Sequence, residues 1–477
     1  MKNSMKLDDV RNVKKKEQAV KEEPVHFYAE RKKIYPRKVK GTFANLRKLA
    51  VFLLLGLYYG LPWIRWDGQQ ALLFDLPARK FHVFGLTFWP QDFFYLALLL
   101  IAAGVALFFF TALAGRLWCG YACPQTVWTE VFIWMEQWVE GDRNKQIGLD
   151  KKPWSWRKLR LKSTKQFLWV TFSLFTGFTF VGYFTPILEL GSQLVHFDLG
   201  PWETFWILFY SFATYGNAGW MREQVCLYMC PYARFQSAMF DKDTLVISYD
   251  QDRGEPRGRR SRKVDPAEAG LGSCIDCNLC VQVCPTGIDI RDGLQYECIG
   301  CAACIDVCDE VMDKMDYPRG LIKYTTESAM NGEKPRILRA RIWVYGAALF
   351  VVLAGLIIGI ANRSPLELDV LRDRNSLYRE TNEGLIENIY SLRLINKDNR
   401  PHLLNLSVLG IEGVQLIGET DSISLSSGEY KELTVKLRVD PVNLDKVSTE
   451  VVFTLESIGD TPIEVSQEGR FLGKLIK

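Results

Sequence analysis

The stretch Cys274-Ile-Asp-Cys277-Asn-Leu-Cys280-Val-Gln-Val-Cys284-Pro285 spaces four cysteines as Cys-x2-Cys-x2-Cys-x3-Cys and follows them with proline. The same spacing returns in a second run, at Cys298, Cys301, Cys304 and Cys308, where Asp309 replaces the proline. Bacterial proteins that bind two four-iron clusters have this ligand pattern. Structural zinc and disulfides are the alternatives, but two identical runs favour a two-cluster, ferredoxin-like α+β domain over residues 251–340.

The two runs are expected to exchange their fourth ligands, because three closely spaced thiolates surround one cluster and the last ligand returns from a distant turn. The spacing therefore predicts one 4Fe–4S cluster at Cys274, Cys277, Cys280 and Cys308. It predicts the other at Cys298, Cys301, Cys304 and Cys284. We expect the protein to transfer electrons.

Several long apolar segments predict an integral membrane protein with three kinds of domain. Uncharged stretches at 93–114, 167–188 and 342–361 are each long enough to cross a hydrocarbon core of about 30 Å as a helix. Shorter stretches at 49–64 and 205–220 lie beside them, so we expect about five membrane helices. Four belong to an α-helical membrane domain over residues 44–250, and the fifth spans 341–363.

The positive charges predict the orientation in the membrane. Residues 1–48 carry fifteen Lys and Arg and residues 115–165 carry ten, whereas 189–201 carry none. Since such charges stay on the cytoplasmic side, we expect the ferredoxin-like domain in the cytoplasm and residues 364–477 in the periplasm of a bacterial inner membrane. Residues 1–43 are expected to be a basic cytoplasmic tail, flexible and attracted to anionic lipid, without a cleaved signal peptide.

Residues 364–477 alternate apolar and polar positions in short runs that are separated by Asn, Asp, Gly and Pro. This pattern predicts an all-β immunoglobulin-like sandwich of about seven strands. None of the chain's twelve cysteines lies in this segment, so a disulfide scaffold is excluded there. No catalytic constellation appears in it, and we expect it to bind a partner.

A weak internal repeat carries the other four cysteines. Cys119-Gly-Tyr-Ala-Cys123-Pro124 is echoed 107 residues later by Cys226-Leu-Tyr-Met-Cys230-Pro231. On a helix, cysteines at i and i+4 share one face, so each pair could present two thiolates to one metal. Thiolates favour Cu(I), zinc or iron–sulfur clusters, and buried thiols without a ligand are the alternative. We expect a second redox site here, and its occupant is left open as copper, a disulfide or another cluster.

The basic linker 253–263 holds six Lys and Arg. A solvated loop near lipid headgroups is one interpretation. The other is a docking patch for an acidic, cytoplasmic electron donor such as a flavodoxin or ferredoxin. The sequence favours no nucleic acid as a partner.

Nearly the whole chain resembles the CcoG/FixG/RdxA family, the accessory proteins of cbb3-type cytochrome c oxidase. The resemblance rests on the two cysteine runs and on Phe84-Gly-Leu-Thr-Phe-Trp-Pro90, Trp118-Cys-Gly-Tyr-Ala-Cys-Pro124 and Cys230-Pro-Tyr-Ala-Arg-Phe-Gln236. It implies an oxidoreductase, a cupric reductase, that supplies Cu(I) to the haem–copper centre of the oxidase. Its implied partners are the oxidase assembly machinery, copper transporters and an unidentified electron donor. We hypothesise copper at Cys119, Cys123, Cys226 and Cys230.

Two other functions stay open. The Cys-x3-Cys-Pro motif is also similar to one in the NapH and NosR membrane ferredoxins, which are linked to quinol oxidation. A membrane quinol dehydrogenase that passes electrons to another reductase is therefore the alternative, although no residue marks a quinone pocket. A non-redox assembly scaffold with structural clusters is the third possibility.

Overall fold

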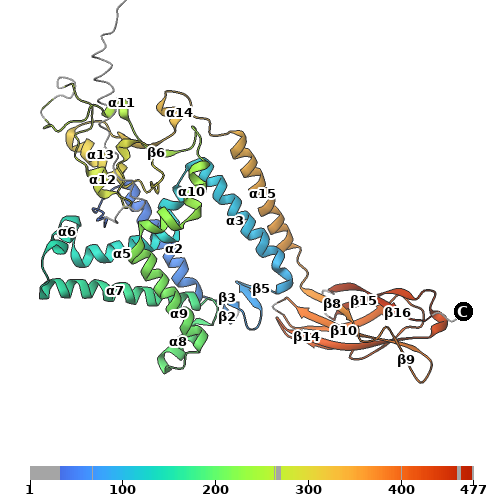
Figure 1. Ribbon diagram of the computed structural model, residues 1–477. Coiled ribbons are helices and arrows are strands. Elements are labelled where there is room, and N and C mark those ends of the chain that lie inside the picture. Colours follow the sequence, from blue (N-terminus) through green and yellow to red (C-terminus); the bar gives the residue numbers. More distant parts are fainter. Residues whose placement is uncertain are drawn as a thin grey trace, which may run out of the picture.

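The computed structural model describes residues 33–474, except 67, 263, 265–269, 399 and 459–462. Its parts follow one another in space: a ferredoxin-like part at one end, a helical part in the middle and a β-sandwich at the far end (Figure 1). The cysteines all lie in the first two parts. The fold therefore separates the candidate redox chemistry from the sandwich.

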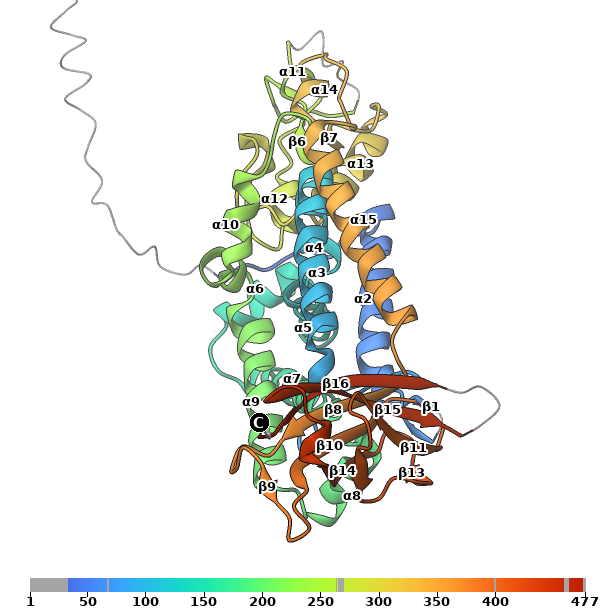
Figure 2. The ribbon, with the colours of Figure 1, turned by 90° about the vertical axis from the view of Figure 1, so that its right-hand side faces the viewer.

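Among the described residues, three helices are long and apolar enough to cross a membrane. They are Thr42–Trp63, which comprises α2 (Thr42–Gly60) and η1 (Leu61–Trp63), then Pro90–Ala114, which contains α3 (Phe93–Ala114), and α15 (Ala340–Ala361). They contain nearly all of the predicted stretches 49–64, 93–114 and 342–361. α3 and α15 lie side by side (Figure 1 and Figure 2), where Tyr95 Oη donates to the Gly359 carbonyl at 2.9 Å.

The other two predicted membrane helices form, but neither has the length and apolarity of the first three. α7 (Trp156–Val181) begins eleven residues before the predicted stretch and includes Lys158, Lys162 and Lys165. It ends at Val181, ahead of α8 (Ile187–His196). α9 (Pro201–Thr214) has 14 residues and continues as a π-helix, η3 (Tyr215–Met221). The predicted count of five crossings is therefore not confirmed.

The ferredoxin-like part is built around a two-stranded antiparallel sheet of β6 (Val246–Tyr249) and β7 (Ile322–Thr325). α12 (Leu279–Val283) and α13 (Ala303–Met315) each begin inside a cysteine run. Their apolar faces share a core with the sheet, made by Ile247, Ile290, Ile305, Met312 and Ile322. The short helices α11 (Gln251–Gly254) and α14 (Glu327–Met330) flank it.

The C-terminal part is a sandwich of two antiparallel sheets. One has the strand order β12-β14-β10-β8, with β9 paired to β10, and the other has the order β13-β11-β15-β16. Alternate residues of both sheets fill a common core that includes Tyr390 and Phe453. The strands are β8 (Leu366–Arg372), β9 (Arg379–Glu380), β10 (Ile386–Asn396), β11 (His402–Leu409), β12 (Gln415–Ile417), β13 (Ile423–Leu425), β14 (Tyr430–Val439), β15 (Ser448–Ser457) and β16 (Glu464–Leu472).

Two details differ from the sequence prediction. The described part of the sandwich has more than seven strands. The additional strands β9, β12 and β13 span only two or three residues, which is too short to establish a period in the sequence. Segment 65–92 lies within the predicted α-helical membrane domain, yet it forms a small sheet of β3 (Leu72–Asp75), β4 (Lys80–Val83) and β5 (Leu86–Phe88), next to a hairpin of β1 (Arg65–Trp66) and β2 (Gln69–Gln70).

The end of the predicted tail is held against the protein. Lys33 Nζ and Tyr35 Oη donate to Asp150 at 3.0 and 2.7 Å, and the Arg37 amide donates to the Gln282 carbonyl at 2.8 Å. The prediction of a flexible tail is therefore wrong for residues 33–41. Residues 1–32 of that tail lie outside the described residues.

A buried ion-pair cluster joins the sandwich to the helices. Asp92, at the start of α3, accepts from Arg363 Nη2 at 2.6 Å and from Lys397 Nζ at 3.0 Å. Lys397 also pairs with Glu367 at 2.5 Å. Arg363 follows α15 and Lys397 follows β10, so a single carboxylate links α3, α15 and the sandwich.

Asp92→Ala should loosen this joint, because it leaves two buried cations without their shared carboxylate. Breaking a buried ion pair in this way costs roughly 3–5 kcal/mol. We expect a lower thermal unfolding temperature and faster proteolysis around residues 363–366. Glu419→Ala is the matched control, since it removes an exposed ion pair with Lys431 in the same sandwich and should have little effect. Equal behaviour of the two variants would contradict the proposed role of Asp92.

Candidate metal centres

The first cysteine pocket lies between α12 and α13. Four cysteines line it: Cys274, Cys277, Cys280 and Cys308. Within the loop, Asp276 and Asn278 have φ values of 50° and 57°. Backbone that alternates between right- and left-handed conformations turns successive N–H groups into one concavity, a geometry that suits anionic iron–sulfur centres.

Arg291 holds this loop in place. Its Nη1 donates to Asp276 Oδ1 at 2.7 Å, its Nη2 to Asn278 Oδ1 at 2.5 Å, and its Nε to Asp289 Oδ1 at 2.8 Å. The two left-handed residues are thus fixed by one buried guanidinium. Sequence reasoning missed Arg291, because no motif marks a residue that acts on a loop 15 positions away.

The second pocket repeats the geometry of the first. It is lined by Cys284, Cys298, Cys301 and Cys304, with Cys280 also at its wall. Gly300 and Ala302 have φ values of 69° and 57°, at the positions that correspond to Asp276 and Asn278. Alanine rarely adopts this conformation, so its presence reflects the demand of the loop. Each pocket thus contains three cysteines of one run and the fourth of the other, the grouping that the spacing predicts.

The donor set of each pocket fits a 4Fe–4S cluster. Burial raises the pKa of Cys280, Cys298 and Cys308 to about 12, so these thiols would be protonated unless a metal displaced the protons. Across the described ranges, no three or more His, Cys, Asp or Glu side chains are arranged to hold a single metal ion. A cluster keeps its four thiolates farther apart than one ion does. Ligation by these eight residues stays a prediction.

The other four cysteines come together at the corners of two helix pairs. Cys119 lies in α4 (Leu117–Tyr121) and Cys226 in the π-helix η4 (Val225–Met229). Cys123 and Cys230 are extended residues just before α5 (Pro124–Glu140) and α10 (Pro231–Ala238). The prediction that each pair shares one helix face is therefore wrong: the second cysteine caps the next helix, whose first residue is the proline.

These four residues form what we call the four-cysteine site. Burial, and then the charge of neighbouring thiolates in the set, raise the pKa of Cys119 and Cys226 to about 12. Cys119 Sγ donates to Gln236 Oε1 at 3.4 Å, and Gln236 Nε2 donates to the Gly115 carbonyl at 2.9 Å. The fully buried Gln236 lies in a stretch that the family resemblance quotes, but its role was not predicted from the sequence.

The four-cysteine site directly adjoins the second pocket. A Cβ on Gly120 would lie only 2.7 Å from the Gly300 carbonyl oxygen. Cys119 packs on a cluster that contains Ile299 and Cys301. A narrow cavity beside them is lined by both Cys226 and Cys301. The two sites therefore meet through the backbones of Gly120 and Gly300.

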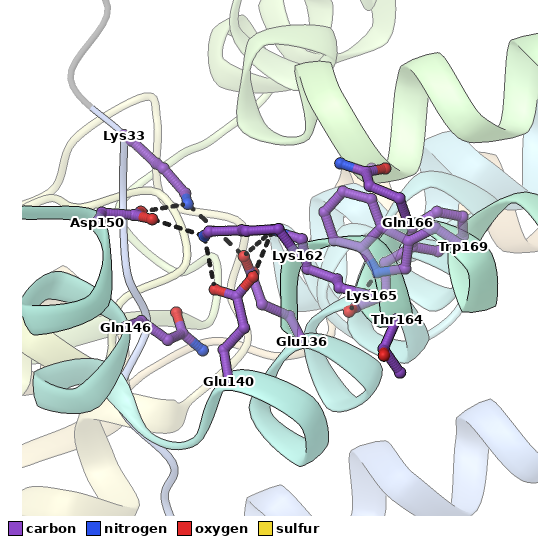
Figure 3. A network of polar contacts seen from close by, with 12 residues as sticks. Lys33, Glu136, Glu140, Gln146, Asp150, Lys162, Thr164, Lys165, Gln166 and Trp169 are labelled. Atoms are coloured by element: carbon purple, nitrogen blue, oxygen red, sulfur yellow. Dashed lines mark hydrogen bonds and ion pairs between the residues drawn. The ribbon is translucent and has the colours of Figure 1, made fainter. Parts of the chain in front are cut away.

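Ion pairs between α5, α7 and the segment before Cys226 hold the two halves of the four-cysteine site together. Glu136 accepts from Arg222 Nη2 at 2.7 Å. Glu136 also pairs with Lys165 at 3.3 Å, and Lys165 pairs with Glu140 at 2.9 Å (Figure 3). Burial alone would raise the pKa of Glu136, yet Arg222 and Lys165 hold it below its usual value. Gln125 Nε2 adds hydrogen bonds to the Asn217 and Arg222 carbonyls at 2.9 and 3.0 Å.

Several basic side chains of the linker 253–263 make contacts within the ferredoxin-like part itself. Arg260 Nη2 donates to the Gly272 carbonyl at 2.6 Å, and its guanidinium stacks on Tyr317. Arg257 and Arg262 pair with Glu255 and Asp316. These contacts favour a structural role for much of this linker, rather than either interpretation offered by the sequence. Lys263 lies outside the described residues.

Glu136→Gln should separate the two cysteine pairs, because Arg222 loses its buried carboxylate. We expect a loss of roughly 3–5 kcal/mol in the free energy of unfolding. Mild oxidation should also form fewer disulfides between the 119/123 and 226/230 pairs, as mass spectrometry of digests would measure. Glu310→Gln, which removes an exposed ion pair with Lys314, should change neither quantity. Wild-type stability and cross-linking in Glu136→Gln would disprove this account.

Family models match three parts of this chain. Residues 221–327 match a 4Fe-4S dicluster domain, residues 96–146 match a 4Fe-4S binding domain, and residues 356–474 match an IG-like fold at the C-terminal of FixG. A crystal structure of a FixG-related protein from Vibrio parahaemolyticus is 35% identical and covers 24% of this chain and 100% of its own, with a TM-score of 0.21.

Three relatives match most of the chain. Nitrogen fixation protein FixG of Rhizobium meliloti is 40% identical over 88% of this chain and 87% of its own. Proteins RdxB and RdxA of Cereibacter sphaeroides are 44% and 42% identical over 80% and 82% of this chain, and over 83% and 85% of their own. With its 4Fe–4S domains and its C-terminal immunoglobulin-like domain, the chain belongs to the FixG/RdxA family of iron–sulfur oxidoreductases.

Proposed function

We propose that this protein is a membrane-bound cupric reductase that supplies Cu(I) for the haem–copper centre of a cbb3-type cytochrome c oxidase. The observation that carries the proposal is the contact between the four-cysteine site and the second ferredoxin pocket, through Gly120 and Gly300. An electron held in that pocket has only a short path to an acceptor at the thiols.

The residues on both sides of this contact suit one-electron reduction of copper. Bound 4Fe–4S clusters would supply single electrons at low potential. Thiolates at Cys119, Cys123, Cys226 and Cys230 select Cu(I) over harder ions, so the site stabilises the product of the reaction. Since no three of these groups are arranged around one ion within the described chain, we propose that copper binds to a subset of the four.

We further propose that the ferredoxin-like part faces the cytoplasm and the sandwich faces the periplasm. The Lys and Arg distribution supports this orientation, and the three apolar helices are compatible with a membrane protein. The sandwich would then be available to oxidase assembly proteins or copper transporters outside, while an electron donor reaches the clusters from inside.

A specific feature favours a quinol dehydrogenase as the second candidate. An open groove between α2 and α5 is lined by the aromatic side chains of Phe52, Trp134 and Trp138, and by Glu130 and Pro285. Pro285 directly follows Cys284 of the second pocket. Such a groove could admit an amphipathic quinol next to that pocket, a feature that the sequence did not reveal.

Replacing all four cysteines of the four-cysteine site by serine should abolish copper reduction and leave the ferredoxin pockets loaded. The test adds Cu(II) anaerobically to dithionite-reduced protein, and follows cluster bleaching together with Cu(I) captured by a chromogenic chelator. Wild type should bleach and form Cu(I) in equal amounts, because each Cu(II) takes one electron. The variant should form Cu(I) no faster than a sample without protein.

Met229→Leu is the matched control, since it alters the exposed side chain between Cys226 and Cys230 without removing a thiolate. It should reduce copper at the wild-type rate. Full activity in the four-serine variant would reject the four-cysteine site as the place of reduction. Wild-type clusters that stay reduced beside Cu(II) but exchange electrons with a soluble quinone would favour the quinol dehydrogenase.

A further inference from the structure

Arg116 lies between the two candidate redox sites. It precedes α4, and its side chain is buried. Its Nη1 donates to the carbonyl of Cys298, the first cysteine of the second run, at 3.1 Å. Its Nη2 donates to the carbonyl of Ala233, in the helix after Cys230, at 3.0 Å. One guanidinium thus contacts a cysteine carbonyl of the second pocket and the helix that follows the last cysteine of the four-cysteine site.

The charge of Arg116 has no carboxylate partner among the residues that the structure describes. Other arginines of this half do have one. The buried Arg222 pairs with Glu136 at 2.7 Å and the buried Arg291 with Asp289 at 2.6 Å, and the partly buried Arg339 pairs with Asp241 at 3.1 Å. Burying an uncompensated cation is costly. Its Nε is also without a hydrogen-bond partner. Beyond its two carbonyl acceptors, such a cation gains stability where negative charge gathers beside it.

Cysteines of both sites lie close to Arg116. Cys298 lines the same cavity as Arg116, and Cys119 follows Arg116 by three residues, in α4. The backbone of Arg116 is also held in place. A Cβ on Gly300 would lie 3.0 Å from the Arg116 carbonyl oxygen, and Gln236 bonds the adjacent Gly115 carbonyl.

We propose that Arg116 is a positioning residue that stabilises negative charge in both the second ferredoxin pocket and the four-cysteine site. The inference rests on the proposed electron transfer between these sites. When one electron passes from the pocket to Cu(II), the pocket loses one negative charge and Cu(II) becomes Cu(I), with no proton required. Because Arg116 lies beside both the second ferredoxin pocket and the four-cysteine site, its positive charge stays close to the electron before and after the transfer.

The test is a redox titration of the full-length, cluster-loaded protein in detergent, without copper, followed by electron paramagnetic resonance. Removing a positive charge destabilises the reduced state of a neighbouring centre. Arg116→Gln should therefore lower the midpoint potential of one cluster and leave that of the other unchanged. Arg116→Lys, which retains the charge, should restore most of the shift, which a purely structural role would not predict.

Arg339→Gln is the matched control. Arg339 is a partly buried arginine at the same end of the molecule, paired with Asp241, and its hydrogen bonds go to Ala112, Thr244 and Arg336 rather than to a cysteine. Its loss should leave both potentials at the wild-type values. If Arg116→Gln does not assemble its clusters, Arg116→His tests the same charge within one sample. The midpoint potential of the cluster beside the imidazole should fall as the pH rises through the imidazole pKa, because the imidazole then loses its positive charge.

Unchanged potentials in a loaded Arg116→Gln protein, or a potential in Arg116→His that follows the wild-type pH profile, would overturn the inference. So would an equal shift in Arg339→Gln. These measurements need no copper. Failure of the wild type to reduce Cu(II) would therefore reject the proposed function without deciding the role of Arg116.

Discussion

The redox half of this protein depends on a close approach of two backbones. At Gly120 a Cβ would lie 2.7 Å from the Gly300 carbonyl oxygen and 2.9 Å from its carbonyl carbon. Any larger residue at Gly120 would push the four-cysteine site away from the second cysteine pocket. At Gly300 the positive φ also favours glycine. Two glycines that are 180 residues apart in sequence therefore set the distance over which electrons would move.

The internal repeat explains how four thiols reach this contact. In each half the second cysteine takes an extended conformation and the following proline starts a helix. The chain therefore turns a corner between the two cysteines of each pair. The pairs come from separate halves of the helical part, and Glu136 and Gln125 of the first half bond the segment that leads to the second pair. The site is thus assembled by contacts between repeats.

Local patterns predicted much of this architecture. The apolar runs located α3 and α15 to within a few residues, and the cysteine spacing anticipated which side chains line each pocket. Local sequence patterns did not predict the features of the structure that depend on contacts between residues far apart in the sequence. α7 extends into a charged stretch because Lys162 and Lys165 find Glu140 and Glu136 on α5. Arg116 and Gln236 escaped notice because their partners lie 117 to 182 residues away.

Asp92 gives the molecule a mechanical property. It ties the outer ends of α3 and α15 to the sandwich, and near the opposite ends Arg339 donates to the Ala112 carbonyl. Two antiparallel helices that are linked at both ends resist bending more than either helix would alone. A lateral force that a bound protein applies to the sandwich would therefore be transmitted through the α3–α15 pair. That force would reach the ferredoxin-like part near Arg339 and Ala112, whereas a flexible linker between the two parts would not transmit it.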